Sequence, residues 1–66
     1  MVDQNIQLGQ LFAAYWRALA RLENELGIPN KTLEEQFPIT KLYTKFWPPT
    51  NNSEETIYQY IKHAQE

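Results

Sequence analysis

The sequence contains no cysteine, only two glycines and no long run of apolar residues. The lack of cysteine excludes a disulfide framework, a thiolate metal site and cysteine-based catalysis. Gly9 and Gly27 are too far apart to form a phosphate-binding loop. The apolar runs are far shorter than the roughly 20 residues of a transmembrane helix, and the segment MVDQNIQ lacks the basic and apolar regions of a signal peptide. We therefore expect a cytoplasmic protein without a membrane segment.

Chain length, net charge and hydrophobic content further limit the kind of protein. A chain of 66 residues is at most one domain, and chains of this length bury only about 60% of their unfolded surface. The net charge of −2 gives no overall attraction to nucleic acid or to anionic lipid. The hydrophobic content of 42% is too high for a disordered segment. We expect one ordered domain over residues 1–66 whose small core gains stability from a partner.

The spacing of apolar residues predicts an all-α fold, a small bundle of three to four helices with one long N-terminal helix over about residues 3–26. Its apolar residues recur in steps of four and three, at Leu8, Phe12, Tyr15, Leu19, Leu22 and Leu26. Asp3 is a candidate N-cap. Gly27 can take the left-handed position after the last turn, and Pro29 prevents the helix from continuing.

Two short helices are expected in the middle of the chain. Thr32 and Glu35 match a capping box, which predicts a helix over about residues 33–37 that ends before Pro38. The next apolar residues again have helical spacing, with Thr40 as a possible cap, and favour a helix over about residues 40–47. A strand is the alternative for this segment, because it is rich in threonine and aromatic residues.

A last helix is expected over about residues 53–65, with Asn52 or Ser53 as its N-cap. Acidic residues in its first turn and Lys62 and His63 near its end complement the helix dipole. Its inward side is predicted to carry Ile57, Tyr58, Ile61 and Ala64, with Tyr60 to one side.

The polar residues do not form a catalytic pattern. His63 is the only histidine and has the position of a helix-end residue. Glu34 and Glu35, like Glu54 and Glu55, are neighbours in a first helical turn, where adjacent side chains point about 100° apart. We expect no enzyme, no catalytic or metal-binding residue, no cofactor and no small-molecule substrate.

The first helix is apolar over about 200° of its circumference, more than one buried face requires. Gly9 costs about 1 kcal/mol inside a helix and is not explained by helix propensity. Exposed Trp and Tyr anchor protein interfaces and stack on unpaired bases, although ordinary core positions are the alternative. The predicted protein-binding residues are Gly9, Ala13, Trp16, Ala20, Tyr43 and Trp47.

Two basic pairs have one-turn spacing and are candidate nucleic-acid contacts. Arg17 and Arg21 lie on the polar edge of the first helix, and Lys41 and Lys45 lie on the middle segment. Either pair could hold a phosphate. The alternative is a solvated face, since four cations in an acidic chain do not form a basic stripe.

LGQLFA at residues 8–13, NKTLEEQF at residues 30–37, the proline and aromatic residues that follow, and a last helix with His63 resemble one known family. They are similar to the C-terminal region of the large subunit of type I-C CRISPR surveillance complexes, although Gln10 stands where that family usually has arginine. The region also occurs as a separate helical small subunit that helps guide the displaced DNA strand. The resemblance implies that Trp16 and its small neighbours contact the assembly and that Arg17 and Arg21 face nucleic acid.

Three functions follow as hypotheses. The first is a helical subunit of an antiviral nucleoprotein assembly that packs on protein neighbours and contacts DNA. The second is an inhibitor or adaptor, such as a phage-encoded anti-CRISPR protein, which binds a protein without touching nucleic acid and fits the acidic balance. The third is a structural homo-oligomer.

Overall fold

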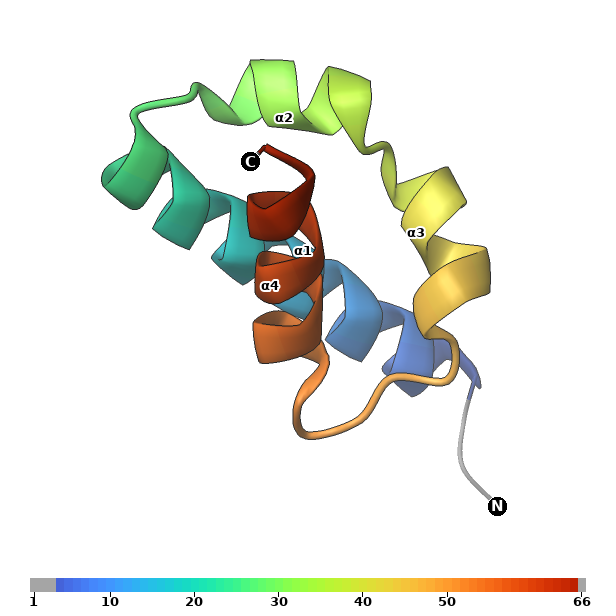
Figure 1. Ribbon diagram of the computed structural model, residues 1–66. Coiled ribbons are helices and arrows are strands. Elements are labelled where there is room, and N and C mark those ends of the chain that lie inside the picture. Colours follow the sequence, from blue (N-terminus) through green and yellow to red (C-terminus); the bar gives the residue numbers. More distant parts are fainter. Residues whose placement is uncertain (1–3, 66) are drawn as a thin grey trace.

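The computed structural model describes residues 4–65, which form four helices and contain no strand (Figure 1). The helices are α1 (Gln4–Leu26), α2 (Asn30–Gln36), α3 (Ile39–Phe46) and α4 (Ser53–Ala64). This architecture confirms the predicted all-α fold with one long N-terminal helix, and it decides the middle segment in favour of helix over strand. The predicted cap Asp3 lies outside the described residues. None of the helices in the described part of the chain is long and apolar enough to cross a membrane.

The end of α1 follows the sequence closely. Gly27 has a φ of 72°, the left-handed conformation that glycine adopts without strain, and its N–H donates to the carbonyl of Glu23 over 2.9 Å. The side chain of Glu23 also accepts a hydrogen bond from the backbone N–H of Asn30, at 2.9 Å. This second contact fixes the first residue of α2 against the last turn of α1.

The starts of α2 and α3 differ from the prediction, because prolines rather than threonines precede the first helical residues. Pro29 and Pro38 are the N-cap residues, with extended backbones at ψ 144° and 149°. The carbonyl of Pro29 accepts hydrogen bonds from the N–H groups of Thr32 and Leu33, so α2 begins at residue 30. The predicted capping box is therefore wrong, since Thr32 lies inside the helix. Thr40 lies inside α3 for the same reason.

Of the two predicted N-cap residues of α4, Asn52 and Ser53, Asn52 has the N-cap position. The Asn52 side chain makes no capping hydrogen bond. Ser53 is the first helical residue, and its buried hydroxyl accepts a hydrogen bond from the backbone N–H of Thr50 at 2.7 Å. The hydroxyl therefore holds the loop before α4 and does not cap the helix.

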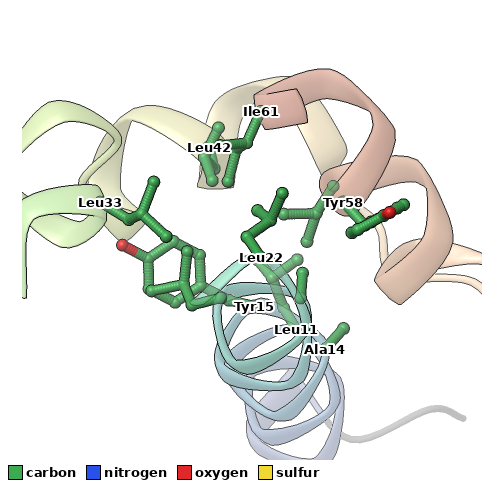
Figure 2. Packing of buried hydrophobic residues seen from close by; sticks show 11 residues of the cluster. Leu11, Ala14, Tyr15, Leu22, Leu33, Leu42, Tyr58 and Ile61 are labelled. Atoms are coloured by element: carbon green, nitrogen blue, oxygen red, sulfur yellow. The ribbon is translucent and has the colours of Figure 1, made fainter. Parts of the chain in front are cut away.

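The core lies on one side of α1, where α2, α3 and α4 pack against it. Figure 2 looks along α1 and shows buried side chains rising from this side toward the other helices. The buried residues of α1 are Leu11, Ala14, Tyr15, Ala18, Leu19 and Leu22, and those of the other helices are Leu33, Leu42, Ile57, Tyr58 and Ile61.

The buried face of α1 is rotated from the predicted stripe. Tyr15, Leu19 and Leu22 are buried as expected, but Phe12 and Leu26 are 43% and 40% exposed. Leu11 and Ala18, which are not part of the predicted stripe, are fully buried instead. In α4 the inward residues are confirmed except Ala64, which is exposed at the last turn. Tyr60 is half-buried between the rings of Phe37 and Phe46, at centroid distances of 6.0 and 5.6 Å.

Candidate protein-binding site

The side of α1 that faces away from the core carries a continuous set of exposed apolar and small residues. We call this set the outer face of α1, and its members are Ile6, Gly9, Phe12, Ala13, Trp16 and Ala20. At 100° per residue they lie opposite the buried Leu11, Ala18 and Leu22. The structure thus places four of the predicted protein-binding residues together and adds Ile6 and Phe12. Phe12 was missed because its spacing also fits the core stripe.

Three large side chains of the outer face remain in water. Ile6 is 58% exposed, Phe12 43% and Trp16 46%. The ring of Trp16 meets the ring of its neighbour Tyr15 in an edge contact with centroids 5.3 Å apart. Single exposed apolar residues are common on proteins, but a contiguous patch on one helix face is typical of an interaction surface.

Gly9 has no role in the packing of the described chain. A Cβ atom at this position would meet nothing within 4 Å, and the backbone of Gly9 is not in a left-handed conformation. An alanine at this position would therefore fit and would stabilise α1. The lack of a side chain at Gly9 leaves the backbone of α1 open to a close approach at that point.

An open groove runs along one edge of the outer face. It has a volume of about 560 Å³ and is lined by Ile6, Gly9, Gln10, Ala13, Ala14 and Arg17 from α1, and by Pro49, Thr50, Asn51 and Glu54. The loop before α4 therefore forms its second wall. The groove makes the outer face concave on this side, so a docked element would meet both helix and loop.

The other two predicted protein-binding residues lie elsewhere. Tyr43 and Trp47 stack on each other with centroids 4.9 Å apart and an angle of 28° between the rings. They belong to α3 and its C-cap, and α3 packs on the core side of α1. Trp47 is half-buried against the core, so this pair is separate from the outer face.

The predicted arginine pair is divided by the fold. Arg21 Nη1 lies 2.8 Å from Glu55 Oε2 and 3.4 Å from Glu54 Oε2, and its guanidinium lies 4.0 Å from the ring centre of Tyr58. The hydrogen bond to Glu55 raises the pKa of Arg21 further. Arg17 lines the groove and makes no ion pair within residues 4–65. The two arginines therefore do not form a free phosphate-binding pair.

Two other charged side chains, those of Lys45 and Glu25, contact aromatic residues. Lys41 and Lys45 are exposed on α3, and the ammonium of Lys45 lies 5.0 Å from the ring centre of Tyr60. Glu25 accepts a hydrogen bond from the hydroxyl of Tyr58, an α1–α4 contact. No three His, Asp or Glu side chains in this range come close enough to hold a metal ion.

Replacing Arg21 by alanine is expected to lower the melting temperature modestly at low salt. In 1 M NaCl the melting temperatures of the variant and the unmodified chain should lie closer together, because salt screens exposed ion pairs. The pKa of Glu55 is lowered, by hydrogen bonds from Gln59 and then Arg21. The stabilisation is therefore present above the ordinary carboxylate pKa and is lost as the pH falls below it. Arg17→Ala is the matched control, and an equal salt response in both variants would contradict the assignment.

Comparisons with protein families, curated proteins and solved structures found no family model, no curated protein and no solved structure that matches the chain. The resemblance to the CRISPR subunit therefore stays a prediction from the sequence. The function has to be argued from the contacts described above.

Proposed function

We propose that this chain is a non-catalytic helical module that binds a protein through the outer face of α1. The observation that carries the proposal is the exposure of Ile6, Phe12 and Trp16 around the small residue Gly9 on one helix face. Large apolar anchors beside small residues are what a docking helix needs, because the anchors supply buried area and the small residues allow close approach. No contact inside residues 4–65 accounts for this combination.

The distribution of charge favours a protein over a nucleic acid as the partner. Arg21 is held by two carboxylates of α4, and Arg17 alone remains beside the outer face. Binding to a phosphate backbone depends on several cations acting together, and the net charge of the chain is −2. Of the two functions that follow from the resemblance, these contacts support the protein-binding inhibitor or adaptor over the DNA-contacting subunit.

The test is capture of partners from the native host by the tagged chain and by two variants of the outer face. Trp16→Ala removes the largest anchor, and Gly9→Leu adds a side chain that blocks close approach, at a position where a Cβ meets nothing within 4 Å. Each variant is expected to reduce the captured partner by roughly 30-fold or more, the effect of removing an interface hot spot.

Thr40→Leu, which adds the same side chain at an exposed position of α3, is the matched control and should capture the partner normally. Nuclease treatment before capture identifies partners that are held only through nucleic acid. Undiminished capture by both outer-face variants, with normal helical content, would contradict the proposal.

A further inference from the structure

We propose that the partner binds the outer face of α1 through an apolar segment that carries an acidic side chain, and that the carboxylate of this side chain pairs with Arg17. This inference rests on the proposed function, because it names the chemistry of the protein that occupies the same face. It is carried by the unlike side chains on the two sides of the face and by the unbalanced charge of Arg17 within residues 4–65.

The outer face has an aromatic side and a polar side. Trp16 and Arg17 are adjacent in α1, so their side chains point about 100° apart. Phe12 lies one turn before Trp16 and is exposed like it. Gln10 lies on the same side as Arg17, and both line the open groove. A segment that lies along the outer face therefore meets apolar rings on one side and hydrogen-bonding groups on the other.

The groove offers more hydrogen-bond donors than acceptors. The side chains of Gln10, Arg17 and Asn51 line it and make no hydrogen bond to other groups of residues 4–65. A guanidinium has five N–H donors and no acceptor, and each amide adds two donors and one carbonyl oxygen. A segment that fills the groove should therefore supply oxygen acceptors. A carboxylate suits this site best, because it accepts two parallel, charge-assisted hydrogen bonds from a guanidinium.

The charge of Arg17 is not balanced by the neighbouring carboxylates. The nearest acidic residue of α1 is Glu23, more than one turn away. Glu54 also lines the groove, but its carboxylate lies 3.4 Å from Arg21 Nη1. Glu55, the other carboxylate on Arg21, lies in the first turn of α4, where the helix dipole favours negative charge. Arg17 thus leaves a positive charge beside the outer face, which favours an acidic segment over a basic one.

The second wall of the groove is fixed by the start of α4. The backbone N–H of Thr50 donates to the hydroxyl of Ser53 over 2.7 Å, and Ser53 is buried. The N–H of Asn52 donates to the hydroxyl of Thr50 over 3.2 Å. These contacts hold the loop that carries Asn51 in place before a partner arrives. A preformed groove loses less conformational entropy on binding, so a short segment can bind without remodelling the fold.

A library of random displayed peptides is the probe. Peptides are selected on the unmodified full chain, and those that also bind Trp16→Ala are removed, so that the retained peptides depend on the outer face. They are expected to combine apolar residues with aspartate or glutamate. Arg17→Glu should weaken the binding of a synthetic peptide of this kind by roughly 10-fold or more. Lys41→Glu makes the same charge change at an exposed position of α3 and should bind the peptide normally.

Exchange of the two charges identifies the pair. Replacing the acidic residue of the peptide by lysine should abolish binding to the unmodified chain and restore binding to Arg17→Glu, whose helical content is checked by circular dichroism. Retained peptides that are basic, or that bind Arg17→Glu as tightly as the unmodified chain, would overturn the inference, while their dependence on Trp16 would still uphold the proposed function.

Two further outcomes would also overturn the inference. One is a selection that yields no peptide dependent on Trp16, and the other is assembly of the chain with itself through the outer face. Capture of a host protein that Gly9→Leu abolishes would, after the first of these outcomes, still uphold the proposed function.

Discussion

Leu22→Ala is expected to leave much of the chain unfolded at 25 °C. Leu22 is fully buried on the core side of α1 and lies among the helices that pack on it (Figure 2). Removing three buried carbons of a leucine costs about 2–5 kcal/mol, depending on how far the neighbours close the cavity. A domain of this size rarely has more than about 3–5 kcal/mol of total stability, so the substitution removes most of it.

Thermal melting followed by circular dichroism at 222 nm measures the effect. At 4–8 °C per kcal/mol for a domain of this size, the melting temperature should fall by at least about 10 °C. Leu26→Ala is the matched control, since it makes the same change in the same helix at a residue that is 40% exposed. Leu26→Ala should lower the free energy of unfolding by less than about 1 kcal/mol. Equal losses in the two variants would show that the assignment of the core face is wrong.

The helices themselves could be predicted from local signals. Steps of three and four residues marked α1 and α4, and the left-handed Gly27 followed by Pro29 ended α1 at the predicted residue. The start of α2 could not be predicted as well, because two local signals competed there. Thr32 and Glu35 have the capping-box spacing, but the extended Pro29 already presents its carbonyl to the next turn, so the helix starts earlier.

The side of α1 that becomes buried could not be read from its own sequence. An apolar arc of about 200° is wide enough for several choices of core face, and the choice depends on where α4 crosses α1. The structure rotates the buried face toward Leu11 and Ala18 and leaves Phe12 exposed. The excess of apolar residues over what one face needs was nevertheless visible, and it located most of the outer face.

The basic residues show the same dependence on tertiary contacts. Arg17 and Arg21 look equivalent in the sequence, because both lie on the polar edge of one helix. Only Arg21 meets the carboxylates Glu54 and Glu55, which are 33 and 34 residues away along the chain. Such distant contacts leave no local signal, so the sequence could not separate a structural arginine from one that is open to a ligand.

Tyr15 joins α1 to the end of α2 and carries the second large expected effect, a loss of stability at high pH. Its side chain is 1% exposed, and its hydroxyl donates a hydrogen bond of 2.6 Å to the carbonyl of Phe37, the C-cap of α2. A carbonyl at this position has no partner within its own helix. Burial, and to a smaller extent the carboxylate of Glu34, raises the pKa of Tyr15 from 10.0 to about 12.

The raised pKa of Tyr15 predicts that stability falls between pH 10 and pH 12. In this range the phenol of the unfolded chain has lost its proton and that of the folded chain still holds it. The unfolded state therefore binds fewer protons, and the free energy of unfolding decreases as the pH rises. The loss from Tyr15 alone should reach about 2 kcal/mol by pH 12.

Tyr15→Phe separates this effect from the titration of lysines and of the other three tyrosines. At pH 8 the variant should be less stable by about 1 kcal/mol, because the Phe37 carbonyl loses its buried donor. The variant cannot ionise at this position, so the difference should shrink above pH 10 and reverse by pH 12. Urea denaturation of both proteins at pH 8, 10 and 12 measures it. If the free energies of unfolding of the two proteins changed in parallel over this range, the Tyr15 hydroxyl would not be buried with a raised pKa.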